Sequence, residues 1–381
     1  MKRGIAGLLA GCICLCCLVR SGWAGAAEDV AVPEAAASIL MEAETGTVLQ
    51  EQNAHVPLSI EMMAKLMTVL LAAECLENGT WMLDTPLTAS DSVRDTKGAV
   101  IWLVPGETMP VEDLLKGVII GNANDAAAVL AEGVSGSIDR FVQDMNARAF
   151  DLGMRDTVFT SPQGYADSVQ QTSAYDLALL CRALQKQTAV MPYFSIWRDF
   201  LRGEGTELVS ENTMTRTYEG HIGFKACHTE QSGWHLAEAA SRDHMTCIAV
   251  VLGCKTEEDR YALAKSLLRS GFSGYRVTIP GFSAENMKPV AVRGGLERGV
   301  LVDAQQLSGL VVPTGSRDLN TVLVLPLYVR APVRKGQVIG RIAFYDGDTL
   351  LYETNLVATH AVEAMSYSHA MTRLLVKMLK I

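Results

Sequence analysis

The chain has 381 residues, of which 49% are hydrophobic and 20% are charged, and its formal net charge is −9. This length and apolar content allow a large buried core and favour two or more domains. The acidic balance disfavours nucleic acid as a partner, because a polyanion is repelled by a surface of the same sign.

The first 26 residues have the pattern of an export signal. Lys2 and Arg3 precede an apolar run over residues 4–19, and the small residues Ala24-Gly25-Ala26 follow. We therefore expect residues 1–26 to be a cleaved signal peptide, and the protein to act at the extracytoplasmic face of the cell membrane or in the cell envelope. The mature chain then has 30 basic and 42 acidic side chains, a net charge of −12.

Four of the nine cysteines lie in this leader. One of them ends the segment Leu9-Ala10-Gly11-Cys12, which is similar to a bacterial lipoprotein processing site, so a lipid on Cys12 is an alternative to cleavage after Ala26. The other five are odd in number, lack metal-binding spacing and lie mostly in apolar runs, which favours buried thiols. They are Cys75, Cys181, Cys227, Cys247 and Cys254.

Helices and strands are mixed in the pattern up to about residue 272. Two strands around a turn are expected first, and an apolar helix that carries Lys65 follows them. A second apolar helical stretch contains an Asn-Ala-Asn turn, and an amphipathic helix comes next. Three strands follow, the first two joined by a turn at residues 229–233. The expected ranges are 36–42 and 46–50 for the first two strands, 114–131 and 141–152 for the two later helical stretches, and 221–227, 234–240 and 246–252 for the last three strands.

Three short segments of this region carry polar side chains. They are Glu61-Met62-Met63-Ala64-Lys65-Leu66-Met67-Thr68, Asn122-Ala123-Asn124-Asp125-Ala126 and Lys225-Ala226-Cys227-His228-Thr229. In an S-x-x-K motif, a serine one helical turn before a lysine becomes a nucleophile when the neutral amine takes its proton. Met62 stands three residues before Lys65, and a thioether has neither a proton to give nor an oxygen to attack with.

These segments resemble motifs of the D-alanyl-D-alanine carboxypeptidases, the low-molecular-mass penicillin-binding proteins of serine peptidase family S11. That family carries A-S-x-T-K-[IL]-M-T, S-x-N-D-A, and K-T-G followed by an aromatic residue or His and then Thr. Relative to it, Met62 and Asn122 replace serines, and Ala226 and Cys227 replace threonine and glycine. Between the segments, the stretches FVQDMNARAFDLGMRDTVFTSPQGY and CIAVVLG resemble the family without such replacements.

The resemblance implies an α+β fold, in which residues 30–273 form a beta-lactamase/transpeptidase-like domain, an antiparallel sheet with helices. It implies that Lys65 is the former catalytic base and that Asn124 hydrogen-bonds the substrate or its network. It also implies that Lys225 and Thr229 bind substrate, on the strand that holds the terminal carboxylate of a peptide. Because two ammonium groups and an amide still attract a carboxylate, binding can outlive catalysis.

Other groups near these segments offer alternative chemistry. Ser59 is six residues from Lys65, about 240° around a helix, so it faces away from that amine and is expected to be a helix N-cap. Cys227 is a candidate nucleophile because Lys225 would lower its pKa, but no positioned base is evident. His228 and His235 flank the same hairpin and could face each other, yet zinc needs two more ligands and only Cys227 is near. We expect no metal and no cofactor.

After residue 274 the pattern changes to short β runs broken by Gly and Pro, which predicts a small all-β domain over residues 274–365. The runs are 275–279, 288–292, 310–312, 321–329, 337–345 and 349–355.

The last residues, 366–381, predict an amphipathic helix with an apolar stripe beside a basic face. Such a helix is too short to span a bilayer and suits an anionic membrane surface, as in the many carboxypeptidases of this family that end in an anchor. The alternative is a helix that caps the β domain. The stripe is Met371, Leu374, Leu375 and Met378, and the basic residues are Arg373, Lys377 and Lys380.

Three hypotheses follow for the function. The first is a non-catalytic protein of peptidoglycan metabolism that binds stem peptides or is the partner of a cell-wall enzyme. The second is an active D-Ala-D-Ala carboxypeptidase that uses a different nucleophile. The third is a purely structural envelope protein with a closed cleft. Loss of the nucleophile favours the first, since that loss alone lowers turnover by about 10⁶ in a comparable serine peptidase.

Overall fold

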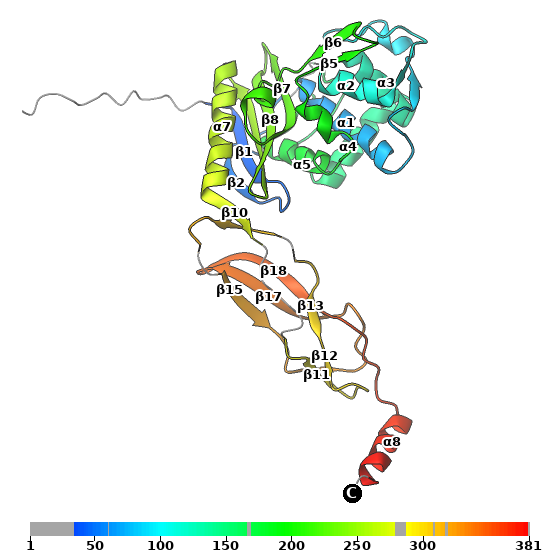
Figure 1. Cartoon of the computed structure of the whole chain (residues 1–381), viewed down its shortest axis with the longest axis vertical. Coiled ribbons are helices and arrows are strands. Elements are labelled where there is room, and N and C mark those ends of the chain that lie inside the picture. Colours follow the sequence, from blue (N-terminus) through cyan, green and yellow to red (C-terminus); the bar gives the residue numbers. More distant parts are fainter. Residues whose placement is uncertain are drawn as a thin grey trace, which may run out of the picture. The chain divides into compact units, whose positions relative to one another are not determined.

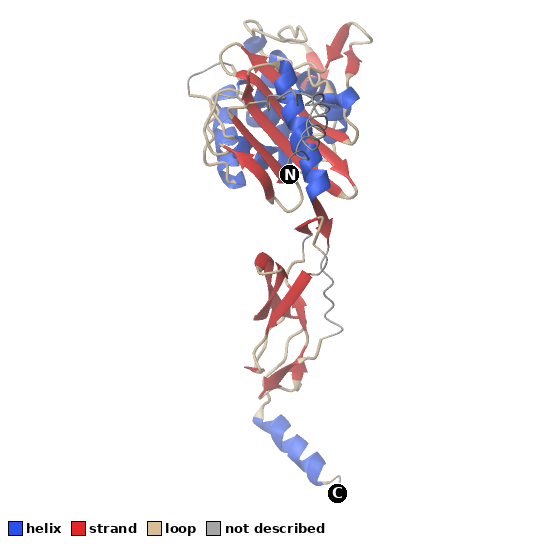
Figure 2. Ribbon diagram, turned by 90° about the vertical axis from the view of Figure 1, so that its left-hand side faces the viewer, coloured by secondary structure: helices blue, strands red, loops and turns tan. Residues whose placement is uncertain are grey.

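The computed structural model describes residues 34–59, 61–165, 169–278, 287–307, 309–316 and 319–379. The predicted signal peptide and Cys12 lie outside these residues. The predicted α+β fold is confirmed, because a sheet flanked by helices is followed along the chain by short strands (Figures 1 and 2).

The main sheet is antiparallel and five-stranded, in the order β2-β1-β9-β8-β7. The order makes β7 an edge strand, and β7 carries the third polar segment. The strands are β1 (Ala37–Glu42), β2 (Val48–Gln52), β7 (His221–Thr229), β8 (Gly233–Arg242) and β9 (Met245–Cys254).

Helices cover both faces of this sheet, and side chains alternate between them. Ile39 and Val250 belong to the core on the side of the helices α1 to α5, whereas Leu40 and Val251 belong to the core on the side of α7 (Figure 1). This alternation is the period of two expected for a strand buried on both faces. The helices are α1 (Lys65–Glu77), α2 (Val111–Ile119), α3 (Asn124–Ser135), α4 (Ile138–Leu152), α5 (Ala174–Leu184) and α7 (Glu257–Gly274).

Local signals explain where several helices begin and end. The hydroxyl of Ser137 accepts a hydrogen bond from the Arg140 amide and caps α4, which ends at Gly153 in the left-handed conformation. Thr256 caps α7 in the same way, and three acidic residues fill its first turn. Such caps satisfy amides that have no partner within the helix.

Shorter elements complete this region. A 3-10 turn, η1, leads directly into α1, a second, η2, lies between β3 and β4, and a third, η3, lies between α5 and β5. Two small hairpins and the short helix α6 lie on the connections. These elements are η1 (Glu61–Ala64), β3 (Pro86–Thr88), η2 (Asp91–Val93), β4 (Thr108–Pro110), η3 (Met191–Ser195), β5 (Arg198–Leu201), β6 (Thr206–Val209) and α6 (Met214–Thr217).

Most strands after residue 274 pack on an apolar core of their own, which includes Val300, Ile342 and Leu356. Tyr275 and Val277 of β10 instead pack against the core on the α7 side of the main sheet. One predicted strand, 321–329, is wrong as a single element, because Pro326 lacks an amide hydrogen and separates β15 from β16. The strands are β10 (Tyr275–Thr278), β11 (Val290–Arg293), β12 (Gly299–Val300), β13 (Val302–Ala304), β14 (Leu310–Pro313), β15 (Leu319–Val324), β16 (Tyr328–Arg330), β17 (Val338–Asp346) and β18 (Thr349–Ala358).

The last element is the predicted C-terminal helix, α8 (Tyr367–Met378), capped by the hydroxyl of Ser366. Its stripe residues Met371, Leu374 and Leu375 are all exposed. Among the described residues, no helix has the length and apolar content needed to cross a membrane.

Candidate functional site

Lys65 is the first residue of α1 and is buried at the end of η1. Its ammonium group donates a hydrogen bond of 2.6 Å to the backbone carbonyl of Gln163. Burial lowers the pKa of Lys65 well below its ordinary value, and the charge of nearby Lys225 lowers it further. A lysine in this environment holds its proton weakly, as a catalytic base must.

Met62 and Asn122 lie against each other, although 60 residues separate them in the sequence. The Asn122 side-chain amide donates to the Met62 sulfur over 3.0 Å. Asn122 lies in the turn between α2 and α3 with a left-handed φ of 57°, and its carbonyl Oδ1 is buried with no partner in the described part of the chain. The structure therefore brings together the two positions at which serines were expected from the resemblance.

Asn124 begins α3 and holds a loop against the helix. Its side-chain amide donates to the Lys97 carbonyl over 2.6 Å, and its backbone amide donates to Ala99 over 2.7 Å. Within the described ranges its carbonyl Oδ1 also lacks a hydrogen-bond partner. Asn124 thus keeps one unpaired acceptor beside the Met62 and Asn122 turn, and an incoming donor would satisfy it.

Lys225 lies in the edge strand β7 and is buried. Burial lowers its pKa, while the carboxylate of Glu211 opposes that shift. Its ammonium makes no hydrogen bond or ion pair with any described residue, whereas that of Lys65 reaches a carbonyl. Glu211 also opposes the shift of Lys65, so one exposed carboxylate acts on both lysines.

Thr229 ends β7, and its side chain contacts the first polar segment. Its hydroxyl donates a hydrogen bond of 2.7 Å to the carboxylate of Glu61, which is buried in η1. The same hydroxyl lies 2.6 Å from that of Ser232 in the turn between β7 and β8. The resemblance did not predict that Glu61 touches the strand.

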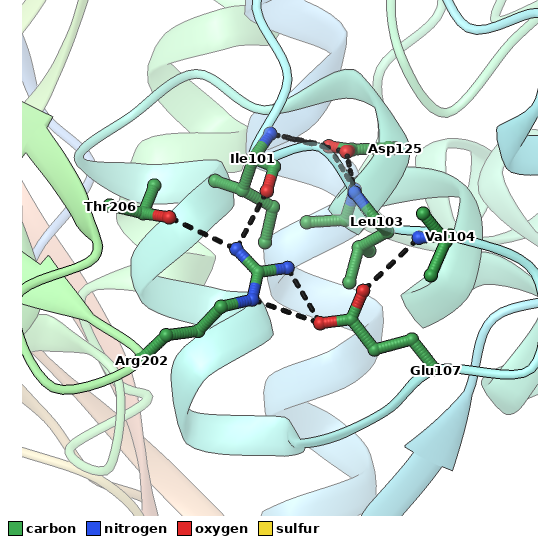
Figure 3. A network of polar contacts seen from close by, with 8 residues as sticks. Ile101, Leu103, Val104, Glu107, Asp125, Arg202 and Thr206 are labelled. Atoms are coloured by element: carbon green, nitrogen blue, oxygen red, sulfur yellow. Dashed lines mark hydrogen bonds and ion pairs between the residues drawn. The ribbon is translucent and has the colours of Figure 1, made fainter.

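The same loop is also fixed by a network of carboxylates and a guanidinium (Figure 3). The Asp125 carboxylate accepts from the backbone amides of Ile101 and Leu103 at 2.9 to 3.1 Å. Arg202 donates to Glu107 over 2.7 Å and to the Ile101 carbonyl over 2.7 Å. These bonds hold the loop that packs on Asn124.

This loop presents Trp102 between the two amides that Asp125 binds. Trp102 has a left-handed φ of 56° and is 73% exposed. A bulky residue keeps such a backbone only where its surroundings impose it. The network was not predicted, because its two carboxylates and one guanidinium come from parts of the chain that no local sequence pattern connects.

Cys227 is fully buried, and burial raises its pKa to about 12 despite the opposing effect of Lys225. The suggestion that Lys225 makes this thiol reactive is therefore wrong, because desolvation is the larger effect. The predicted buried thiols are confirmed for Cys181, Cys247 and Cys254 as well, while Cys75 is half-buried.

Ser59 does not cap α1, because Ala64 precedes that helix and η1 lies between. It lines a cavity of about 280 Å³ together with Ser232 and His235. No hydrogen bond joins it to Lys65 in the described part of the chain, which agrees with the prediction that it faces away.

His228 and His235 do not face each other. His228 pairs with Trp234 across the hairpin and stacks on it, while His235 pairs with Cys227. Neighbouring residues in a strand point to opposite faces, so the two imidazoles lie on different sides of the sheet. Among the residues that the structure describes, no group of three His, Cys, Asp or Glu side chains has the arrangement of a metal site.

Comparisons with known proteins identify the family. The profile described as D-alanyl-D-alanine carboxypeptidase, peptidase S11, matches residues 25–256, and the penicillin-binding protein 5 C-terminal domain matches residues 283–364. The first match covers more than half of the chain. The chain therefore belongs to the S11 family of D-alanyl-D-alanine carboxypeptidases.

Individual relatives agree with this assignment over most of their length. The D-alanyl-D-alanine carboxypeptidase DacF of Bacillus subtilis is 31% identical over 94% of both chains. DacC of Escherichia coli is 29% identical over 94% of this chain and 92% of its own. The crystal structure of penicillin-binding protein 5 from Haemophilus influenzae has a TM-score of 0.81 at 25% identity, covering 87% of this chain and 98% of that one.

Proposed function

We propose that this protein is a catalytically silent member of its family, which acts in peptidoglycan metabolism outside the cytoplasm by binding stem peptides. The observation that carries the proposal is the contact of 3.0 Å between the Met62 sulfur and the Asn122 amide, one turn before the buried Lys65. A thioether and an amide fill the positions where the family places hydroxyl groups.

Hydrolysis through an acyl intermediate needs an oxygen or sulfur nucleophile beside a base. Lys65 retains the properties of a base, because burial lowers its pKa. It donates to a carbonyl, however, and no described hydroxyl or thiol is bonded to it. Cys227 holds its proton because its pKa is about 12, so a base survives without a nucleophile to activate.

Binding has a physical basis at the same place. The strand β7 is an edge strand of the described sheet, and extended peptides bind such strands through main-chain hydrogen bonds. Lys225 lies in this strand without a hydrogen-bonded partner among the described residues. A peptide carboxylate beside it would raise the lowered pKa of its ammonium, so binding should weaken as the pH rises and the ammonium loses its proton.

The domain boundaries and the location are also part of the proposal. We place a signal peptide at residues 1–26, a peptidase-like domain at 30–273, a β domain at 274–365 and a membrane-surface helix at 366–381. The exposed apolar stripe of α8, with Arg373 beside it, supports association with an anionic membrane.

Labelling with a fluorescent penicillin, together with a D-Ala-D-Ala hydrolysis assay, tests the catalytic part. We expect no covalent adduct and no hydrolysis in the wild type, and no fast hydrolysis in Met62→Ser, because Asn122 and the Ala226-Cys227 pair leave the proton network and the binding strand incomplete. An adduct mapped by mass spectrometry to Ser59 or Cys227 would show an enzyme with a different nucleophile.

Calorimetry with a peptide that ends in D-Ala-D-Ala tests the binding part. We expect weak binding, and Lys225→Ala should reduce the binding free energy by about 1.5 to 3 kcal/mol, the range for a charge-assisted hydrogen bond. Lys186→Ala, an exposed lysine on the same domain, is the matched control. If no such peptide binds at millimolar concentration, a structural role or a protein partner replaces the stem peptide.

A further inference from the structure

We propose that Glu61 is an internal ligand of a carboxylate-binding site at Thr229, and that its side chain competes with the terminal carboxylate of any peptide that enters along β7. The inference deepens the proposed function, and it rests on that function only for the identity of the peptide. It starts from a chain of hydrogen bonds in which every donor is fixed.

The chain of hydrogen bonds begins at His235. The backbone amide of Gly253 donates to His235 Nδ1 over 3.1 Å, so this nitrogen carries no proton. Burial lowers the pKa of His235 to about 4, and the ring is therefore neutral. The remaining nitrogen, Nε2, must carry the proton, and it donates to the Ser232 hydroxyl over 2.9 Å.

The next two groups are the hydroxyls of Ser232 and Thr229. The Ser232 backbone amide also donates to the Thr229 oxygen, over 3.2 Å. Since the Thr229 proton points to the Glu61 carboxylate over 2.7 Å, the bond of 2.6 Å between the two hydroxyls runs from Ser232 to Thr229. Thr229 then uses both of its acceptor positions, and only its donor remains.

Thr229 is thereby built to bind an acceptor. A chain of aligned hydroxyl groups polarises its last member, and a hydrogen bond to a carboxylate is stronger than one between neutral groups. The acceptor present in this molecule is the side chain of Glu61. Any ligand that binds this hydroxyl by an acceptor must first displace that carboxylate.

The backbone of Glu61 is held in place from two sides. Its φ is 42°, in the left-handed region that residues other than glycine rarely adopt. Gln170 donates its side-chain amide to the Glu61 carbonyl over 3.3 Å. Gly164 packs so closely on that carbonyl that a Cβ at position 164 would overlap it. A backbone in this region persists only where its surroundings impose it, and here they fix Glu61 where its side chain accepts from Thr229.

The side chain of Glu61 is an unusual choice for this position. It is buried, and within the described ranges no cation pairs with it. A buried carboxylate is costly unless hydrogen bonds compensate for lost water, and Thr229 provides the one that the structure shows. The corresponding position in the family motif is alanine, which has no carboxylate to occupy the site.

Four proteins test the competition: Glu61→Ala, Thr229→Val, the double variant, and Glu51→Ala as a control that removes an exposed carboxylate. Peptides that end in D-Ala-D-Ala, with a free carboxylate or as the amide, are titrated into each protein. Glu61→Ala should bind the acid about tenfold or more tighter than the wild type, the ratio expected for one charge-assisted hydrogen bond, and the amide within about twofold.

The other variants distinguish the role of the Thr229 hydroxyl from that of Glu61, its internal ligand. Thr229→Val should not gain affinity, and the double variant should lose the gain of Glu61→Ala. An equal gain for acid and amide would mean that Glu61→Ala only opens space, and no gain for the acid in a folded Glu61→Ala protein would overturn the proposal. Circular dichroism confirms folding, and Glu61→Gln, which keeps the volume and an acceptor for Thr229 but removes the charge, should give a smaller gain for the acid than Glu61→Ala.

Acetate provides a readout that does not depend on the stem peptide. In Glu61→Ala with labelled threonine methyl groups, acetate should shift the Thr229 methyl signal in a saturable way, and it should not do so in the wild type or Glu51→Ala. If acetate binds and no peptide does, the carboxylate site stands and the stem-peptide ligand is wrong. If acetate fails to bind at Thr229, the carboxylate site itself is refuted.

Discussion

Two adjacent residues at the start of α3 show how differently the frame and the site are built. Asp125 accepts hydrogen bonds from the Ile101 and Leu103 amides, and the loop it holds is bound again by Arg202 (Figure 3). Asn124 keeps a buried carbonyl oxygen without a partner among the described residues. At these two adjacent positions, the frame residue has partners for its carboxylate, whereas the site residue keeps one acceptor unpaired.

The site extends this difference to Asn122 and Lys225. The carbonyl oxygen of Asn122 is buried and has no partner among the described residues, and the ammonium of Lys225 makes no hydrogen bond with any of them. An unpaired buried polar group costs about 1 to 3 kcal/mol, so the carbonyl oxygens of Asn122 and Asn124 lower the stability of the fold. The site therefore keeps two acceptors with which the donors of a ligand can pair.

The largest effect should come from the frame. Asp125→Ala leaves the buried amides of Ile101 and Leu103 without their acceptor, which should lower the free energy of unfolding by about 3 kcal/mol or more. Chemical denaturation measures this change. Asp139→Ala, which removes an exposed carboxylate in the first turn of α4, is the control and should stay within about 0.5 kcal/mol. A comparable loss in both variants would contradict the assigned role of Asp125.

Lys65→Met should stabilise the protein, because a buried ammonium without a carboxylate partner is replaced by an apolar chain of similar length. We expect a gain on the order of 1 to 2 kcal/mol near neutral pH. Folding lowers the pKa of Lys65. The free-energy cost of burying its ammonium is therefore largest below the pKa of the folded state, and it disappears as the pH rises to the unfolded value of about 10.4.

The pH dependence gives this prediction its sharpest form. The difference in the free energy of unfolding between Lys65→Met and the wild type should shrink as the pH rises from 7 towards 10. Titration of thiols such as Cys227 contributes equally to both proteins and cancels in this difference. Lys186→Met, at an exposed position, should show no such trend. A difference that grows with pH would mean that the site stabilises the Lys65 ammonium.

Much of the fold could be predicted from the sequence, and the contacts across the site could not. A strand was predicted over residues 36–42, and β1 covers most of this range, with Ile39 and Leu40 in the cores on opposite faces of the sheet. The resemblance placed Met62 and Asn122 in one site, and their contact agrees with it. The bond from Thr229 to Glu61 joins residues 168 positions apart, and no local pattern reports such a contact.

The Cys227 prediction failed for a related reason. Lys225 stands two residues away, and the sequence shows this proximity, but it does not show that the thiol is fully buried. Burial acts on the pKa more strongly than the neighbouring charge. Desolvation depends on packing from α1 and the sheet together, which only the folded chain defines.

Asn124→Ala tests the other side of the comparison and should have a small effect. It removes the hydrogen bond to Lys97, but it also removes the unpaired buried carbonyl oxygen, and the two contributions oppose each other. We expect a change in the free energy of unfolding below about 1 kcal/mol. A loss as large as that of Asp125→Ala would show that Asn124 belongs to the frame rather than to the site.

The smallest effect on stability should come from deleting residues 368–381, which removes most of α8. The apolar side chains Met371, Leu374 and Leu375 are exposed, so their loss should change the melting temperature by less than about 1 °C. The same deletion should move the protein from the membrane fraction to the soluble fraction.

Replacing Leu374 and Leu375 by serine separates apolar contact with lipid from the charge of Arg373, and should also release the protein. A clear drop in melting temperature with unchanged fractionation would instead support a helix that caps the β strands.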